Sequence, residues 1–332
     1  MSTDSRKLKY ALAINEALHQ VMAEDESVFL IGQGVKSPWY VGSTAKGLLE
    51  RFGSERVIDT PVSENAITGA AVGAAIVGMK PVVIHPRMDF MLYAMDPIIN
   101  QAANWHYMFG GRSSVPVVVW GVINRGGEQA AQHSQAFHTL FSHIPGLKVV
   151  MPSTPYDAKG LMIAAIREPN PVIYIDDRWI HGTEGPVPEE LYEVPIGKGV
   201  IRRKGADVTL VGVSYLMQHA MDAADALARE GIECEVIDLR TIKPFDKDLI
   251  VNSARKTGRL AVADVGWKSY GMAAEIASCV FENCFSSLKA PLIRVTLPDS
   301  PAPASSQLET AYYPGENDIQ TAIKKIFSNR SV

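Results

Sequence analysis

The sequence predicts an α/β protein built from two doubly wound domains, on the basis of three observations. Short apolar runs rich in valine and isoleucine alternate with longer segments of helical periodicity along almost the whole chain. Continuous apolar runs are typical of strands in a parallel sheet that helices cover on both faces. The length of 332 residues suits two domains, and the alternation breaks over residues 182–204. We therefore predict a first domain over residues 1–190, a linker over 191–204 and a second domain over 205–332.

The elements can be assigned in order along the chain. The strands that we predict are Val28–Gly32, Val57–Thr60, Pro81–His85, Pro116–Gly121, Lys148–Met151, Val172–Ile175, Asp207–Val213, Glu233–Leu239, Arg259–Asp264 and Leu292–Leu297. The helices between them are Ala11–Ala23, Thr44–Phe52, Glu64–Val77, Pro155–Arg167, Leu216–Arg229, Lys247–Lys256, Met272–Phe285 and Asp318–Phe327. Glycines follow two of these helices, at Gly53 and Gly231, as expected of helix ends.

Composition and charge exclude several classes of protein. The net charge of −4 and the absence of a concentrated basic run argue against a nucleic-acid partner. We find no signal peptide and no apolar run long enough to span a membrane. The 3 cysteines show no CxxC spacing, so neither a disulfide framework nor a zinc site is expected. These features predict a cytoplasmic protein without a membrane partner.

The segment Thr60–Ala66 places an acidic residue where a strand gives way to a helix. Pro61 ends the strand, Ser63 can cap the helix, and Glu64 lies in the first helical turn. The helix dipole alone favours a carboxylate there, so a purely structural role is one interpretation. The helix that follows has almost no polar side chains, and we expect it to be buried throughout. An acid at the tip of such a helix, at the carboxyl end of a strand, is typical of a ligand site in open α/β sheets.

Two further segments carry candidate site residues. Gln132–Gln135 crowds four polar side chains behind the Gly126–Gly127 loop, and His133 is presented there on the carboxyl side of a strand. Phe90 and Tyr93 lie three residues apart on a predicted helix, where they either pack in the core or form a platform for a planar ring. The chain has no GxGxxG, P-loop, HExxH or GxSxG motif, and no Gly-Asp-Gly followed by paired asparagines. The sequence therefore offers contacts for a ring but no motif that would bind a diphosphate.

From residue 8 to 328 the chain resembles the beta subunit of the thiamine-diphosphate-dependent decarboxylase component of 2-oxo acid dehydrogenase complexes, of the pyruvate, branched-chain and acetoin types. The resemblance rests on segments in one order along the chain: Pro61-Val-Ser-Glu64, Met95-Asp-Pro-Ile-Ile-Asn-Gln-Ala-Ala103, Tyr107-Met-Phe-Gly-Gly111, Gln132-His-Ser-Gln135, His143-Ile-Pro-Gly-Leu-Lys-Val-Val-Met-Pro-Ser153, Glu235-Val-Ile-Asp-Leu-Arg-Thr-Ile-Lys-Pro-Phe245, Asp264-Val-Gly-Trp267 and Leu297-Pro-Asp299. It implies a pyrimidine-binding domain followed by a transketolase-type C-terminal domain.

The resemblance also implies roles for single residues. Glu64 matches the glutamate that hydrogen-bonds the aminopyrimidine of thiamine diphosphate, Phe90 the aromatic residue against that ring, and Val62 an apolar contact beside it. His133 matches the active-site histidine that acts as acid or base on substrate intermediates and in acyl transfer to a lipoyl group. A structural potassium ion held by main-chain carbonyl oxygens is implied at Val117, Ala165, Glu168 and Asn170.

The implied partners follow from the same family. An alpha subunit carries the diphosphate and Mg²⁺ motif, in an α2β2 assembly, which agrees with the missing diphosphate grip. A lipoyl acyltransferase is a further expected partner. Two alternatives remain: the C-terminal half of a split transketolase, against which the Gln132–Gln135 motif speaks, and a non-catalytic scaffolding subunit, which the retained Glu64 and His133 disfavour.

Three positions depart from the pattern common among relatives. Gln33 stands where acidic residues usually follow the first strand, and Trp120 stands where the strand commonly ends in arginine. Arg87, in His85-Pro86-Arg87, replaces part of a more apolar run beside the cofactor and can restore a positive charge. We therefore predict an unusual substrate, or an acceptor other than a standard lipoyl domain.

Overall fold

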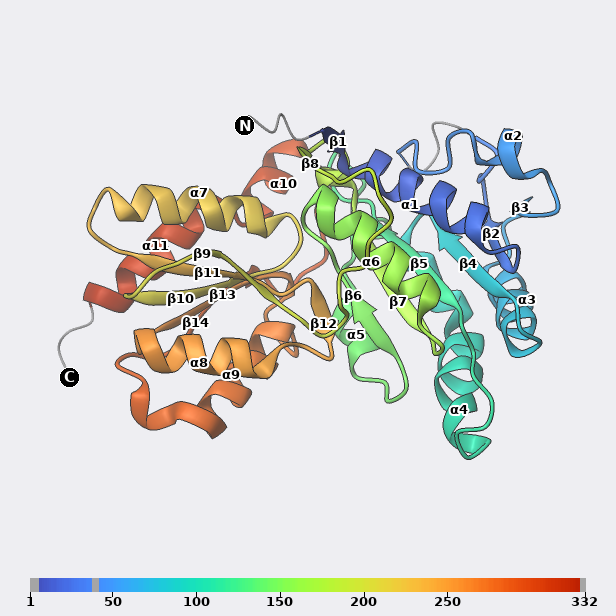
Figure 1. The fold of residues 1–332 in the computed structure, drawn as a ribbon. Coiled ribbons are helices and arrows are strands. Elements are labelled where there is room, and N and C mark those ends of the chain that lie inside the picture. The colour runs from blue at the N-terminus through green and yellow to red at the C-terminus, as the bar shows by residue number, and fades with distance from the viewer. Residues whose placement is uncertain (1–5, 38–41, 329–332) are drawn as a thin grey trace. The chain divides into compact units, whose positions relative to one another are not determined.

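The computed structural model describes residues 6–37 and 42–328. The chain divides into two compact units, each a sheet between layers of helices (Figure 1). The first unit comprises Met1–Gly126 and Gln132–Ile196, and the second comprises Gly127–Ala131 and Gly197–Val332. A doubly wound α/β architecture in both halves confirms the predicted fold class.

The first unit contains a parallel sheet in the strand order β6-β7-β5-β4-β2-β3. Its elements in chain order are β1 (Lys7–Lys9), α1 (Tyr10–Glu24), β2 (Val28–Gly32), α2 (Leu48–Phe52), β3 (Val57–Asp59), α3 (Glu64–Ile76), β4 (Lys80–His85), η1 (Met88–Ala94), η2 (Asp96–Ala103), α4 (Asn104–Met108), β5 (Val118–Ile123), α5 (His138–Ser142), β6 (Lys148–Val150), α6 (Pro155–Arg167), β7 (Val172–Asp177), η3 (Arg178–Ile180) and β8 (Glu184–Pro186). Strands β2, β5 and β7 are buried along their whole length, as their unbroken apolar runs predict.

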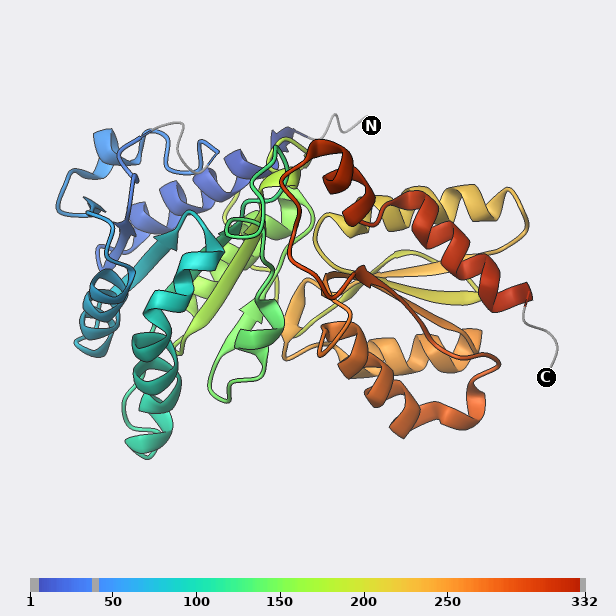
Figure 2. The same ribbon diagram turned by 180° about the vertical axis from the view of Figure 1, so that it is seen from behind.

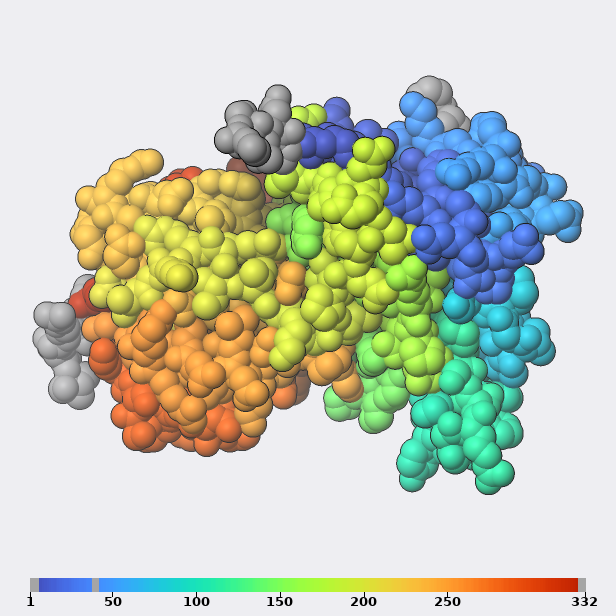
Figure 3. All heavy atoms as spheres, viewed as in Figure 1, coloured from blue at the N-terminus to red at the C-terminus, as the bar shows by residue number. Residues whose placement is uncertain are grey.

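Helices cover both faces of this sheet. Helices α1 and α6 pack against each other on one face, and α3, η1 and η2 pack together on the other (Figures 1 and 2). In the space-filling view, the yellow-green surface of the chain near residue 190 adjoins the blue surface of the N-terminal part (Figure 3). There Gln20 Nε2 and Lys159 Nζ donate hydrogen bonds to the Glu189 carbonyl oxygen at 2.7 and 3.1 Å.

The second unit has a sheet in the order β14-β13-β10-β11-β9, in which β9 runs antiparallel to β11 and the other pairs are parallel. Its elements are β9 (Val200–Arg203), β10 (Val208–Gly212), α7 (Leu216–Ala228), β11 (Cys234–Asp238), β12 (Thr241–Lys243), α8 (Lys247–Thr257), β13 (Leu260–Trp267), α9 (Met272–Cys284), η4 (Phe285–Ser287), β14 (Ile293–Leu297), α10 (Ser306–Tyr312) and α11 (Glu316–Ser328). Helices α7 and α11 pack together on one face and α8 and α9 on the other (Figure 1).

Helix α3 differs from the prediction that it is buried throughout. Ile67, Ala71 and Ala75 are buried, but Ala66, Gly69, Ala70, Gly73 and Val77 at its end are exposed within the described chain. The exposed positions recur with helical spacing and are nearly all small, so they form one apolar face. The prediction was wrong because an apolar helix can face a partner chain as well as its own core.

Helix α2 begins later than predicted, at Leu48 instead of Thr44. Gly47 precedes it with a φ of 74°, a left-handed conformation that interrupts helical backbone and that glycine adopts without strain. The other predicted helices begin within two residues of their observed starts, because their periodic apolar faces pack directly on a sheet.

Candidate active site

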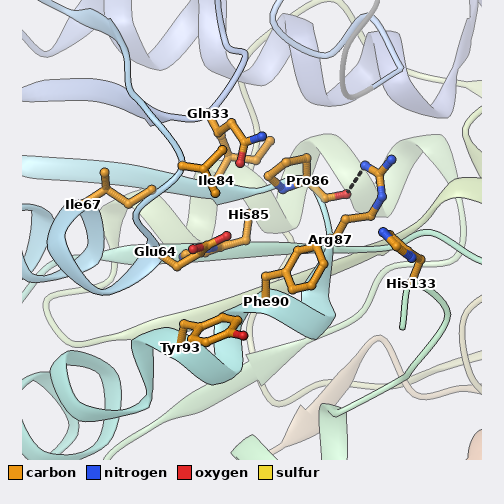
Figure 4. Close-up of a pocket in the computed structure, with 11 residues that line it drawn as sticks. Gln33, Glu64, Ile67, Ile84, His85, Pro86, Arg87, Phe90, Tyr93 and His133 are labelled. Atoms are coloured by element: carbon orange, nitrogen blue, oxygen red, sulfur yellow. Dashed lines mark hydrogen bonds between the residues drawn. The ribbon is translucent and has the colours of Figure 1, made fainter. Parts of the chain in front are cut away.

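A cavity of about 490 Å³ lies in the first unit. Strands β2, β3 and β4 are parallel, so the segments that follow them emerge at one edge of the sheet. These segments supply most of the cavity wall, which is lined by Gln33, Val62, Glu64, Ile67, Ile84, His85, Pro86, Arg87, Phe90, Tyr93 and His133 (Figure 4). The location is the one that the strand–helix pattern predicts for a ligand in this type of sheet.

Glu64 is the first residue of α3, and its half-buried side chain lines the cavity. Ser63 occupies the N-cap position as predicted, although its side chain makes no capping hydrogen bond. Within the described residues, no basic side chain lies within 4.0 Å of the Glu64 carboxylate. The carboxyl group is therefore available to a ligand in the cavity.

Apolar side chains surround the Glu64 end of the cavity. Ile67 comes from the same helix, one turn along, and Ile84 from the end of β4. Val62 is 67% exposed and Phe90 is half-buried, and both also line the cavity. An acid beside apolar walls and an aromatic ring fits a planar heterocycle that offers a hydrogen-bonding nitrogen.

His133 lies against Phe90. The two ring centroids are 5.5 Å apart and the ring planes meet at 86°, an edge-to-face arrangement. Phe90 and Tyr93 both line the cavity because η1 is a 3-10 helix, in which side chains three residues apart point the same way. The structure thus brings together Glu64, Val62, Phe90 and His133, which come from three separate segments of the sequence.

Asp89 holds the polypeptide next to His133. Its Oδ1 accepts hydrogen bonds from the main-chain nitrogen and the side-chain Nε2 of Gln135, at 3.2 and 2.8 Å. Asp89 is 4% exposed, and burial raises the pKa of its carboxyl group against the opposing effect of the Gln135 hydrogen bonds. Sequence reasoning did not find Asp89, since its role depends on a contact 46 residues away.

His85, which the sequence places in the run beside the cofactor, makes a contact that only the structure reveals. It is 1% exposed at the end of β4, and its Nε2 lies 3.0 Å from Thr68 Oγ1. Burial lowers the pKa of His85 to about 4, so the imidazole is neutral at pH 7. Thr68 is one turn beyond Glu64 on α3, and this hydrogen bond ties the helix that carries Glu64 to the end of the strand.

The three positions at which the sequence departs from the family pattern lie in different surroundings. Gln33 and Arg87 line the cavity. Trp120 does not, because it points into the core, where its ring meets Tyr174 edge-on with centroids 6.1 Å apart. A change at Trp120 therefore reaches the cavity only through packing.

The residues implied for potassium lie at the opposite edge of the sheet, beside the start of β5 and the end of α6. Asn170 Oδ1 is buried without a hydrogen-bond partner, so an unused oxygen exists there. The Val117 carbonyl oxygen already accepts a hydrogen bond from Val172 at 3.0 Å. Among residues 6–37 and 42–328, no group of three or more His, Cys, Asp or Glu side chains could hold a metal. Potassium binding stays a prediction.

Comparisons with known proteins agree with this architecture. Residues 6–178 match the transketolase pyrimidine binding domain, and residues 197–319 match the transketolase C-terminal domain. A solved structure titled split gene transketolase, inactive beta4 tetramer, superposes with a TM-score of 0.79 at 21% identity, over 98% of this chain and 99% of that chain. The fold and the domain matches define a transketolase-like protein of the thiamine-diphosphate superfamily.

Curated relatives narrow this class. The acetoin:2,6-dichlorophenolindophenol oxidoreductase subunit beta of Cupriavidus necator is 44% identical over 331 residues, which is 97% of this chain and 98% of that protein. The pyruvate dehydrogenase E1 component subunit beta of Rickettsia felis is 43% identical over 314 residues, 95% of this chain and 96% of that protein. The chain belongs to the family of beta subunits of pyruvate and acetoin dehydrogenase E1 components, which confirms the resemblance that the motifs predict.

Within the described residues, no helix is both long and apolar enough to cross a membrane.

Proposed function

We propose that this chain is the beta subunit of a thiamine-diphosphate enzyme that decarboxylates a 2-oxo acid oxidatively or cleaves acetoin, with acyl transfer to a lipoyl group. The observation that carries the proposal is the cavity in which Glu64, Phe90 and His133 meet. We assign residues 1–190 to the pyrimidine-binding domain, 191–204 to a linker and 205–332 to the C-terminal domain.

The residues present fit the cofactor. When bound, thiamine diphosphate supplies a carbon nucleophile and takes up the electron pair left by the broken bond. Glu64 would share a proton with the aminopyrimidine ring, since its carboxyl group lies at a helix tip beside apolar side chains. Phe90 and Val62 would position that ring and exclude water from it. Such a proton shared in a dry site favours the ring tautomer that can act as a base.

His133 would serve the substrate. Its imidazole lines the same cavity, and Phe90 fixes its orientation through the edge-to-face contact. An imidazole exchanges protons near neutral pH, which suits an acid or base for substrate intermediates and for acyl transfer. Asp89 would hold the segment that carries His133 in place through Gln135.

The chain would act with an alpha subunit that supplies the diphosphate and Mg²⁺ site. A lipoyl acyltransferase would be a further partner. The sequence contains no diphosphate motif of its own. The exposed apolar face of α3 and the 67% exposed Val62 support a partner close to Glu64, because such a face is costly in water. We retain the potassium site at the carbonyl oxygens of Val117, Ala165, Glu168 and Asn170, where the unpartnered side-chain Oδ1 of Asn170 would be an additional oxygen ligand. The second candidate function is that of a split transketolase. The similarity between this chain and the solved split gene transketolase supports a shared fold alone.

The test is Glu64→Gln in the enzyme assembled with its alpha subunit. We expect turnover to fall by about 10²–10⁴, the usual contribution of positioned proton transfer. Glu55→Gln is the matched control, since Glu55 is exposed and lies outside the cavity. Unchanged turnover in Glu64→Gln, with normal assembly, would show a scaffolding subunit instead. A neighbouring gene that encodes Gly-Asp-Gly and paired asparagines would identify the alpha partner.

A further inference from the structure

Arg87 is a cavity-wall residue to which the proposed function gives no task. It follows β4 directly and is half-buried. Its Nη1 donates a hydrogen bond to the Pro86 carbonyl oxygen at 3.2 Å, while its Nε is buried without any hydrogen-bond partner. Within the described residues, no carboxylate lies within 4.0 Å of this guanidinium.

Several other arginines of the chain are paired with carboxylates. Arg6 contacts Glu16 at 2.7 Å, and Arg202 contacts Asp238 at 2.9 Å. Arg125, which is wholly buried, lies 2.9 Å from Asp177. These pairs compensate the loss of water around each guanidinium, which is otherwise costly. Arg87 has one neutral carbonyl oxygen in place of such a partner. Its positive charge can therefore be compensated by an anionic ligand in the cavity.

The cavity has two chemically different parts. Figure 4 draws Glu64 toward one end, Arg87 and His133 toward the other, and Phe90 between them. Burial keeps the pKa of His85 at about 4, so this neighbour adds no positive charge at neutral pH. A guanidinium presents several N–H donors in a planar fork that matches the two oxygens of a carboxylate, and it also binds phosphate.

We infer that Arg87 binds an oxyanion group of the substrate, so that the enzyme prefers an anionic substrate, such as a 2-oxo acid, to neutral acetoin. The inference rests on the proposed function and assigns the substrate class of the same site. A bond of this kind holds the substrate before reaction as well as during it, so it acts chiefly on KM. Carboxylate and phosphate are both oxyanions that accept hydrogen bonds from a guanidinium, and a comparison of substrates that carry one or the other distinguishes them.

The test compares Arg87→Met and Arg87→Lys with the wild type in the enzyme assembled with its alpha subunit. The substrates are pyruvate, acetoin and xylulose 5-phosphate, which are a carboxylate, a neutral ketone and a phosphate. We expect kcat/KM of Arg87→Met for pyruvate to fall by about 10–100-fold through KM, the usual loss for a hydrogen bond to a charged group. Acetoin turnover should change by less than about threefold and Arg87→Lys should recover part of the loss, since lysine retains the charge without the fork. Arg229→Met, at an exposed position, is the control.

A binding measurement separates this inference from the proposed function. Oxamate is an unreactive anion shaped like pyruvate, and its affinity for the assembled enzyme can be measured calorimetrically. Weaker oxamate binding in Arg87→Met supports the oxyanion site even if the wild type turns over none of the three substrates, a result that would reject the proposed function alone. A selective loss for xylulose 5-phosphate also supports the site and assigns its anion to a phosphate. Equal losses for pyruvate and acetoin, unchanged oxamate binding, or a defect confined to assembly with the alpha subunit would overturn the inference.

Discussion

Asp89 Oδ1 accepts two hydrogen bonds from Gln135, one from the main chain and one from the side chain. Asp89 precedes Phe90, and Gln135 lies two residues after His133, so this contact and the Phe90–His133 contact join the same two segments. A single short 3-10 helix, η1, thereby fixes the loop that carries the histidine. We conclude that η1 is the element on which the geometry of this half of the cavity depends.

Replacing Asp89 tests this conclusion. We expect Asp89→Ala to lower kcat of the assembled enzyme by about 10–100-fold, because small displacements of a positioned group are costly. The amide of Gln135 should lose its protection against hydrogen exchange, since its acceptor is removed. Asp89→Asn should keep most activity, because the asparagine side-chain oxygen can still accept the main-chain hydrogen bond.

The control for this experiment is Asp96→Ala. Asp96 is an exposed carboxylate on η2 that accepts a hydrogen bond from Asn100 at 2.8 Å. Its loss should leave both kcat and exchange at Gln135 unchanged. If Asp89→Ala retained full kcat while Gln135 exchanged faster, the contact would be structural and the positioning role would be wrong.

His85 makes stability depend on pH in a defined direction. Its pKa falls from 6.5 to about 4 on folding, so the unfolded chain takes up a proton between these values and the folded chain does not. Stability is therefore fully present above about pH 6.5 and is lost progressively as the pH falls toward 4. The shift corresponds to a loss on the order of 3 kcal/mol.

We expect His85→Phe to remove this contribution. The difference in unfolding midpoint between wild type and variant, measured in urea, should shift in favour of the variant as the pH is lowered from 7 toward 4. The cost of leaving Thr68 Oγ1 without its partner is independent of pH and cancels from the trend. His143→Phe, at an exposed position, should run parallel to the wild type. A difference for His85→Phe that stays constant with pH would contradict the assignment.

Much of the fold follows from sequence because a buried parallel strand leaves a clear pattern. The apolar runs at β2, β10 and β11 predict those strands to within a residue or two, since both faces of each are covered. The short strands β1 and β9 were not predicted, because three or four residues at a sheet edge carry no distinctive periodicity.

The candidate site, like the fold, could be predicted from the sequence only in part. Glu64 and His133 could be located from chain position alone, because parallel strands bring their carboxyl ends to one edge. The Asp89–Gln135 and Thr68–His85 contacts could not, since they join side chains from different segments and no local pattern encodes such pairs. The exposed face of α3 was missed because composition does not distinguish a core from a partner surface.

Outside the cavity, the buried side chain of Lys159 connects three parts of the first unit. This wholly buried ammonium on α6 lies 2.7 Å from Glu16 Oε1 on α1, and it donates hydrogen bonds to the carbonyl oxygens of Pro188, Glu189 and Glu190 at 2.8, 3.1 and 2.9 Å. It is therefore the point at which α1, α6 and the segment around Glu189 are tied together.

We expect Lys159→Met to destabilise the protein by roughly 3 kcal/mol, because Glu16 loses a buried charge partner and three carbonyl oxygens each lose one donor. Methionine retains the length of the aliphatic chain, so lost packing contributes little. Urea unfolding measures the change, and limited proteolysis should cut first around Glu189 in the variant. Lys204→Met, at an exposed position, should leave the midpoint within about 0.5 kcal/mol of the wild type. If Lys159→Met unfolded at the same urea concentration as the wild type, water would have to replace the ammonium, and the three carbonyl oxygens would not depend on it.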